Sequence, residues 1–206
     1  MAKPKLEKKD GRLHLVLGDK SLSVDLTEGA LGFRLKHSSP KKELLYKALV
    51  GKAKLPLKVV DATAGLGRDA FLLAYFGMEV FAFEKNPYVF EILKDGLARA
   101  PQEVANRIHL VNEDFLKFSS GERFHGIYID PMFPKAEKSA MPKKEMQILQ
   151  QLSLEEDNAP ELLSHAEGFD VGRIVVKRPI SAPLLKSSVA VQFKGNSIRF
   201  DVYIKL

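Results

Sequence analysis

Hydrophobic and polar residues follow two different patterns along the chain, and the change comes near residue 57. In the first part, Leu13, Leu15 and Leu17 alternate with other residues, and the same period of two continues at 22–26 after a Gly18-Asp19-Lys20 turn. A period of two places alternate side chains on one face of a strand. The pattern predicts a β-hairpin, followed by a turn-rich segment at 27–40, a short helix at 41–50 and a linker at 52–56.

From residue 57, short apolar strands alternate with helical segments, which is typical of βαβ units and a parallel sheet. Strands are expected at 57–61, 79–84, 107–111, 124–130 and 173–177, helices at 68–77, 86–99 and within 143–167, and a terminal hairpin at 188–194 and 197–205. The pattern therefore predicts an α/β, Rossmann-like domain over residues 53–206, behind a small basic unit of hairpin and helix over residues 1–52.

Composition narrows the class of protein. The 206 residues are 45% hydrophobic and include no cysteine, which excludes a disulfide scaffold, a cysteine-ligated zinc finger and a thiol nucleophile. No apolar run approaches the ~20 residues of a membrane span, and the opening segment is charged where a signal peptide would become apolar. The expectation is a soluble, cytoplasmic protein with no membrane contact.

The net charge of +6 is unevenly distributed. Residues 1–60 carry a net charge of +8, residues 61–169 carry −7, and residues 170–206 carry +5. Such asymmetry indicates a polyanion held by basic flanks around an acidic centre. The alternative is that these charges are solvated faces with no partner.

A glycine-containing turn follows the first strand of the α/β part. In DATAGLGRDA at 61–70, Gly65 and Gly67 lie between a strand and a helix, where small residues let a nucleotide-like ligand approach backbone N–H groups. Glu84, at the end of the next strand, stands where an acid accepts ribose hydroxyls. The turn alone fits NAD as well as S-adenosylmethionine (SAM), and a third possibility is that the glycines serve packing only.

Acidic residues around the turn favour the methyl donor. Asp61 would repel a pyrophosphate but suits the amino end of a methionine moiety. Arg68 and Asp69 extend the contact surface, and Asp114 follows the third strand, where an acid accepts the adenine amino group or caps a helix.

The segment IYIDPMFP at 127–134 combines a carboxylate, a rigid turn and an aromatic ring. Methylation of an exocyclic base nitrogen requires that its N–H groups be accepted and the nitrogen be held in line with the methyl group. Asp130 and the carbonyl of Pro131 are the candidate acceptors, and Phe133 is the candidate stacking ring. One carboxylate matches the adjacent N1–H and N2–H of guanine, which favours guanine over adenine. The alternative is a proline-rich loop with a buried phenylalanine.

Basic residues occur on both sides of this segment. Those expected to contact RNA phosphates are Arg34, Lys36, Lys135, Lys138, Lys143, Lys144, Lys177 and Arg178. Each one alone is also compatible with a solvated surface cation. The five histidines show no ligand spacing, so no metal site is expected.

Together these segments resemble a known family. The sequences DATAGLGRDAF at 61–71, FEKNP at 83–87, YIDPMFPKAEKSAMPKKEM at 128–146 and VVKRP at 175–179 are similar to the bacterial small-subunit ribosomal RNA guanine-N2 methyltransferases, from about Glu28 to the C-terminus. The resemblance implies a seven-stranded methyltransferase fold, SAM as methyl donor and a guanine near the 3′ end of 16S ribosomal RNA, position 1516, as acceptor. It assigns cofactor contacts to Arg68, Asp69, Glu84, Lys85, Asp114, Phe115 and Asp130.

The expected function is therefore direct methyl transfer from SAM to guanine N2, with 16S ribosomal RNA or the small ribosomal subunit as partner. Three alternatives stay open: transfer to adenine N6 or a protein glutamine, an NAD(P)-dependent oxidoreductase, and a noncatalytic ribosome-assembly factor that binds RNA. The sequence does not indicate an oligomeric state.

Overall fold

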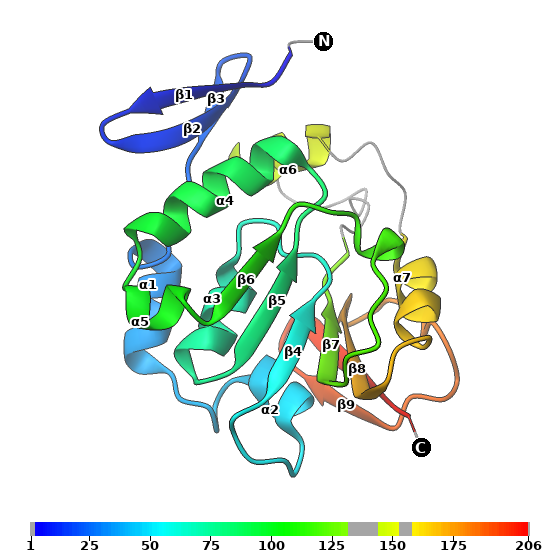
Figure 1. The fold of residues 1–206 in the computed structure, drawn as a ribbon. Coiled ribbons are helices and arrows are strands. Elements are labelled where there is room, and N and C mark those ends of the chain that lie inside the picture. The colour runs from blue at the N-terminus through cyan, green and yellow to red at the C-terminus, as the bar shows by residue number, and fades with distance from the viewer. Residues whose placement is uncertain (1–2, 132–143, 153–157, 206) are drawn as a thin grey trace.

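The computed structural model describes residues 3–131, 144–152 and 158–205. Its centre is a seven-stranded sheet with the order β6-β5-β4-β7-β8-β10-β9 (Figure 1). The strands are β4 (Lys58–Asp61), β5 (Glu79–Phe83), β6 (Ile108–Val111), β7 (Phe124–Ile129), β8 (Val171–Pro179), β9 (Val191–Lys194) and β10 (Ile198–Ile204). The first five strands in that order pair in parallel, whereas β10 runs antiparallel to β8 and β9. The expected α/β class and terminal hairpin are confirmed.

The order of the strands reverses between β4 and β7, which are neighbours in the sheet although β5 and β6 lie between them in sequence. Open α/β sheets bind ligands beside such a reversal, at the carboxyl ends of the strands. The residues that follow β4, β5 and β7 therefore meet at one edge of the sheet.

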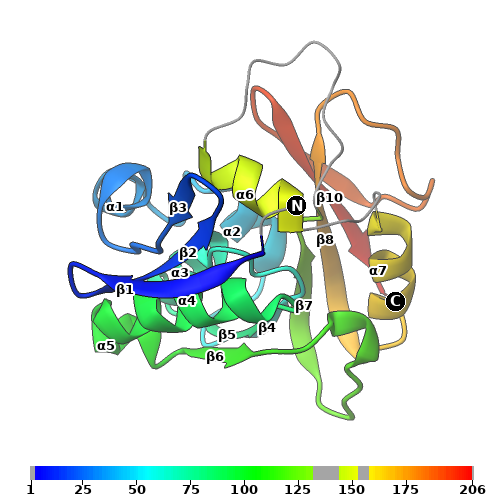
Figure 2. The same ribbon diagram turned by 90° about the horizontal axis from the view of Figure 1, so that it is seen from above.

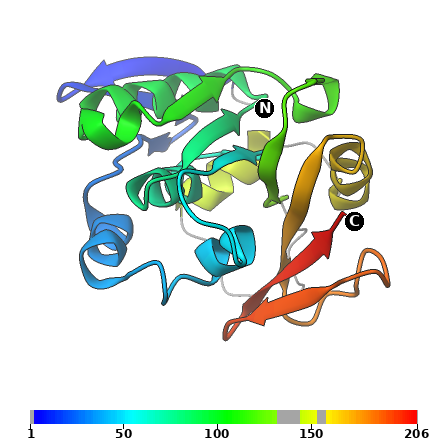
Figure 3. The ribbon, with the colours of Figure 1, turned by 60° about the horizontal axis from the view of Figure 1, so that its bottom comes forward.

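Helices cover both faces of the sheet because the strands are apolar on both sides. Along β7, Tyr128 belongs to one hydrophobic cluster, and Ile127 and Ile129 belong to the other. The helices and the short 3-10 turn are α1 (Gly29–His37), α2 (Leu44–Val50), α3 (Arg68–Tyr75), α4 (Pro87–Arg99), α5 (Gln102–Ala105), η1 (Phe115–Lys117), α6 (Lys144–Leu152) and α7 (Ala159–Ala166). Figure 3 shows α2, in cyan, beside the terminal hairpin in orange and red.

Local sequence explains where α4 begins. The side chain of Asn86 accepts hydrogen bonds from the backbone N–H groups of Tyr88 and Val89, and Pro87 occupies the first helical position. Sequence analysis predicted this start correctly.

The N-terminal part differs from the sequence-based expectation. It forms a three-stranded antiparallel sheet of β1 (Lys5–Lys9), β2 (Arg12–Leu17) and β3 (Lys20–Leu22), which lies beside α4 in Figure 2. The charged sequence KLEKK of β1 has no apolar alternation, because this strand is mostly exposed. The expected second strand of the hairpin, at 22–26, is wrong beyond Leu22, because β3 ends at that residue. Val24 and Leu26 are nevertheless buried.

The turn-rich segment at 27–40 contains a helix that the sequence analysis did not predict. Helix α1 buries Leu31 and Leu35, which are spaced by one helical turn, but its glycines and short length hide that period. The N-terminal elements and the sheet share one hydrophobic cluster, to which Leu15 and Leu45 contribute. The division of the chain at residue 52 stays a prediction.

Candidate active site

A cavity of about 610 Å³ opens at the carboxyl ends of β4, β5 and β7. This volume lies within the usual range of small-molecule sites. Its polar lining comes from separate elements: Arg34, Asp61, Thr63, Arg68, Asp69, Glu84, Lys85, Asn86, Glu113, Asp114, Tyr128, Asp130, Asn158 and Lys177. The cavity therefore gathers the five acidic residues singled out in the sequence.

The glycine turn forms one wall of the cavity. Gly65 and Gly67 have φ angles of 53° and 71°, which are in the left-handed region that favours glycine. A Cβ atom at Gly67 would lie 2.4 Å from Cδ1 of Leu93, so the turn also brings α3 close to α4. The backbone N–H of Asp130 donates to Thr63 Oγ1 at 2.7 Å, which joins the turn to the end of β7.

Glu84 holds the turn against the end of β5. Its Oε2 accepts from the Gly65 N–H at 2.9 Å, and its Oε1 accepts from the Asn86 N–H at 2.7 Å. Burial raises the pKa of Glu84 to about 7, against the opposing effect of these two bonds. Each carboxylate oxygen retains a second lone pair for a ligand hydroxyl.

Asp61 is a buried acid at the end of β4. Its side chain accepts from the Thr63 N–H at 3.1 Å, and the residue is only 1% exposed. Burial, followed by repulsion from Asp69 and Asp130, raises the pKa of Asp61 to about 8. Without a bound cation, Asp61 is therefore largely protonated at neutral pH, and a positive ligand group would favour its ionised form.

This pKa predicts a pH-dependent stability. Because the folded pKa lies above the ordinary value of 3.8, the folded chain binds a proton that the unfolded chain releases, and the free energy of unfolding falls as pH rises toward about 8. Glu84 acts in the same direction but only up to about 7. Between about pH 7 and pH 8, we expect Asp61→Asn to remove a slope of about 1 kcal/mol per pH unit in urea titrations of the cofactor-free protein. A slope that persists in this variant would contradict the assignment, and the exposed Glu122→Gln variant is the control.

A chain of alternating charges crosses the cavity wall from α1 to β8. Lys177 Nζ lies 2.7 Å from Asp130 Oδ2 and 3.5 Å from Asp69 Oδ2. On its other side, Asp69 pairs with Arg34 at 3.2 Å, and Arg34 also pairs with Glu43 at 2.5 Å. The Tyr128 hydroxyl donates to Asp69 Oδ2 at 2.8 Å. We call these six residues the charge network.

The two carboxylates beside Lys177 respond differently to it. Burial opposes ionisation of Asp69, but Lys177 and Arg34 outweigh burial and hold its pKa below the ordinary value. For Asp130, burial prevails over Lys177 and raises the pKa. Burial also opposes the charge of Lys177, yet the two carboxylates keep its pKa above the ordinary value. Asp130 is thus the member of the network that most readily takes a proton.

The structure brings together most of the expected cofactor residues. Those that line the cavity are Asp61, Gly65, Arg68, Asp69, Glu84, Lys85, Asp114, Phe115 and Asp130, with Pro131 beside them. Gly67 acts through the shape of the turn. The Asp114 side chain also caps η1 by accepting from the Leu116 N–H at 3.0 Å, as the alternative interpretation had it.

The expected RNA contacts are more dispersed. Phe133, Lys135, Lys138 and Lys143 lie outside the described residues, and Lys144 begins α6. Lys36 is exposed on α1, as a phosphate contact requires.

Three of the expected RNA contacts have surroundings that the sequence did not show. Arg178 is only 4% exposed, so its buried guanidinium is not presented to phosphates. Arg34 and Lys177 belong to the charge network, where carboxylates already engage them. The position of a basic residue in the sequence could not show whether its side chain pairs with an acid inside the protein or faces solvent.

Sequence analysis missed Tyr128, Thr63 and Glu43. Tyr128 precedes Asp130 by two positions, and the period of two in a strand was the signal that both face the same side. No comparable signal identified Glu43, because α1 was not predicted.

Comparisons with known proteins match almost the whole chain. A family described as "Putative SAM-dependent methyltransferase" matches residues 2–205. The ribosomal RNA small subunit methyltransferase J of Hahella chejuensis is 44% identical over 189 residues, with 87% of this chain and 71% of the relative covered. The chain belongs to this family of SAM-dependent methyltransferases. A second relative of the same name, from Marinobacter nauticus, is 39% identical over 190 residues, covering 87% of this chain and 68% of the relative.

A solved methyltransferase structure supports the same conclusion. The SAM-dependent methyltransferase from Neisseria gonorrhoeae is 31% identical to this chain and superposes with a TM-score of 0.75. The match covers 98% of this chain and 83% of the Neisseria chain. The resemblance and the methyltransferase fold are confirmed. The family also decides the cofactor that the glycine turn left open, namely SAM rather than NAD(P), and makes the protein an enzyme rather than a noncatalytic factor.

The cavity fits SAM in size and chemistry. Its volume suits a ligand of this class, and the carboxyl groups of Asp61 and Glu84, whose pKa values burial raises, stand at the ends of neighbouring strands. SAM supplies an activated methyl group on a positively charged sulfur. In the described part of the chain, no three acidic or histidine side chains gather as a metal site, and no helix is long and apolar enough to cross a bilayer.

Proposed function

We propose that this methyltransferase transfers the methyl group of SAM to the exocyclic N2 of a guanine in 16S ribosomal RNA. The observation that carries the proposal is the position of Asp130. Asp130 lies between the end of β7 and Pro131. It lines the SAM cavity and pairs with Lys177 at 2.7 Å. The relatives' name, ribosomal RNA small subunit methyltransferase J, supports this RNA as the partner, either free or in the small subunit.

Different residues of the chain would bind the methyl donor and the acceptor nucleotide. Asp61 would receive the amino end of the methionine moiety, Glu84 the ribose hydroxyls and Asp114 the adenine amino group. Gly65 leaves room for the ligand beside the backbone. Arg68, Lys85 and Phe115 complete the cavity wall.

Asp130 would act on the acceptor nucleotide. A guanine offers adjacent N1–H and N2–H groups to one carboxylate, which orients the N2 lone pair. The amine loses a proton when it gains a methyl group, and the raised pKa of Asp130 suits it to receive that proton. The Pro131 carbonyl is a second acceptor, and Phe133 is proposed to stack on the base.

Mass spectrometry of ribosomal RNA tests this function. RNA from cells that contain the protein should carry one additional methyl group on a guanine near the 3′ end of 16S RNA, and RNA from cells that lack it should not. Purified protein with SAM should restore the modification. An RNA in which inosine replaces the target guanine lacks N2 and should accept no methyl group. Methylation of adenine N6 or of a protein glutamine would contradict the guanine assignment.

A further inference from the structure

Helix α1 exposes an aromatic pair that the charge network does not use. Phe33 is 65% exposed, more than any other large hydrophobic residue in the described part of the chain. Its ring stacks on His37 with centroids 4.1 Å apart and an interplanar angle of 22°. His37 Nδ1–H donates to the Phe33 carbonyl at 2.9 Å, which fixes the orientation of the second ring. The pair therefore presents an ordered aromatic surface to solvent.

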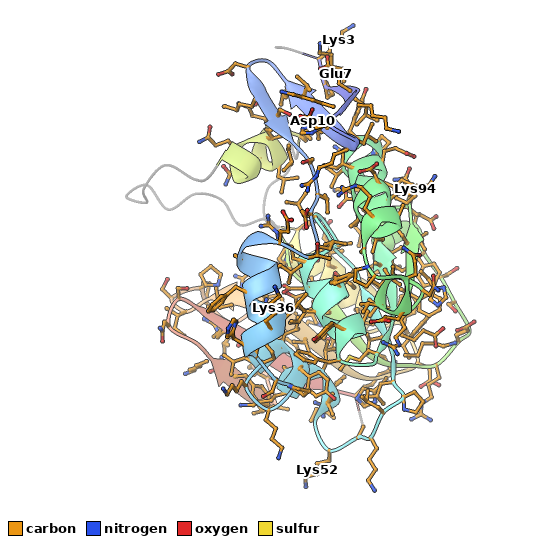
Figure 4. All side chains as sticks on the ribbon, turned by 90° about the vertical axis from the view of Figure 1, so that its left-hand side faces the viewer. Lys3, Glu7, Asp10, Lys36, Lys52 and Lys94 are labelled. Carbon is orange, nitrogen blue, oxygen red and sulfur yellow. The ribbon has the colours of Figure 1, made fainter. Side chains whose placement is uncertain are left out.

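Three exposed cations lie close to this pair in sequence. Lys36 lies between the two rings in sequence, and Lys41 and Lys42 follow shortly after α1; all three are exposed. Residues 29–42 contain no acidic residue. In Figure 4, Lys36 lies on α1, well above Lys52 at the bottom of the molecule. The surface thus combines stacking rings with positive charge, which complements a polyanion that carries flat bases.

The same helix reaches the active site from its other side. Arg34, adjacent to Phe33, lines the SAM cavity and pairs with Asp69 at 3.2 Å. Successive side chains on a helix point about 100° apart, so α1 places Arg34 in the cavity wall while Phe33 faces solvent. An RNA chain on the outer side of α1 is consequently close to the cavity.

We propose that Phe33, His37 and Lys36, which we call the α1 platform, bind an unpaired segment of the RNA substrate. A base would stack on Phe33, and Lys36, with Lys41 and Lys42 nearby, would contact the phosphates. The inference rests on the proposed function, because it assigns the RNA a place on the enzyme. Unpaired nucleotides are the expected ligand because bases within a duplex do not expose their flat faces.

RNA binding by the full chain tests the platform directly. The probe is a fluorescent single-stranded RNA of about 12 nucleotides, followed by anisotropy with and without SAM. Loss of one stacked base weakens binding by about 5- to 150-fold, and we expect Phe33→Ala to show this loss while Phe33→Trp retains affinity. Lys36→Ala should lower the slope of log affinity against log salt by about 0.7, whereas Phe33→Ala should leave the slope unchanged.

Two exposed residues outside the α1 platform provide matched controls. Tyr75 is 44% exposed at the end of α3 and contacts Phe76 edge-on, and Lys52 lies far from α1 in Figure 4. Tyr75→Ala and Lys52→Ala should bind the RNA as the unmodified protein does. Thermal unfolding checks that Phe33→Ala remains folded, as its exposure leads us to expect.

The outcomes separate the platform from the proposed function. Unchanged RNA affinity in Phe33→Ala, or an equal loss in Tyr75→Ala, would overturn the platform even if the unmodified enzyme methylates 16S RNA. Failure of the unmodified enzyme to methylate that RNA would overturn the proposed function, while the binding comparison would still decide whether α1 holds single strands. Preference for a duplex of the same sequence would also overturn the platform.

Discussion

Asp130→Ala is expected to lower the rate of methyl transfer by about 10²- to 10⁴-fold, the usual contribution of a positioned acid or base. The variant lacks the carboxylate that would hold the guanine amine and receive its proton. Because Asp61 and Glu84 remain in place, SAM should still bind measurably in calorimetry. Lys177 keeps Asp69 as a partner at 3.5 Å, so the cavity wall should survive the substitution.

Two companion variants make the Asp130 result specific. Asp130→Asn keeps the size and one hydrogen-bond acceptor but cannot receive the proton, so we expect nearly intact SAM binding with a slow transfer step. Asp170→Ala removes an aspartate whose side chain is 68% exposed at the other edge of the sheet, and its rate should equal that of the unmodified enzyme. Activity retained in Asp130→Ala would refute the role proposed for this residue.

Lys177→Met is expected to slow methyl transfer and to shift the pH–rate profile to higher pH. Among the neighbouring charges, Lys177 has the largest effect in favour of the ionised form of Asp130. Without it the pKa of Asp130 rises further, so this carboxyl takes up a proton at a higher pH. The acidic limb of the pH–rate profile should therefore shift to higher pH, and activity should recover partly as pH is raised.

The same substitution should destabilise the fold by about 3 kcal/mol, the lower end of the usual cost of removing one partner of a buried ion pair, because it leaves two largely buried carboxylates without their shared cation. Lys177→Arg preserves the charge and should restore most of the stability. Measured unfolding in urea, together with the pH–rate profile, separates a positioning role from a purely structural one. A variant that is less stable but has an unchanged pH profile would show that Lys177 does not act through Asp130.

Sequence patterns predicted the sheet well because its strands are buried. Short continuous apolar segments such as those around Val60 and Ile127 are typical of strands that are buried on both faces of a sheet. Asn86-Pro87 marks the start of a helix because the Asn86 side chain caps it and Pro87 suits its first position. Helix α1 and strand β1 were missed for the opposite reason. Strand β1 is mostly exposed, so its sequence carries no apolar alternation. Helix α1 is held partly by contacts with distant parts of the chain, such as that between Arg34 and Asp69, and local periodicity does not report such contacts.

The candidate site was predicted in its acids more completely than in its cations. Asp61, Glu84 and Asp130 each follow or end a parallel strand, so topology alone brings them to one edge. Lys177 and Arg34 were expected to face RNA, but the structure pairs them with carboxylates. Whether a cation faces solvent or a buried acid depends on its tertiary neighbours, and those were not visible in the sequence.

The charge network also constrains the order in which the enzyme becomes functional during synthesis. Its members are contributed by α1, the segment before α2, α3, β7 and β8, so the wall is incomplete until Lys177 has left the ribosome. Before that moment, Asp69 and Asp130 lack their common cation, and β7 lacks the parallel neighbour that β8 supplies. A nascent chain that ends before β8 would therefore contain every glycine of the cofactor turn and still be unable to form the finished site.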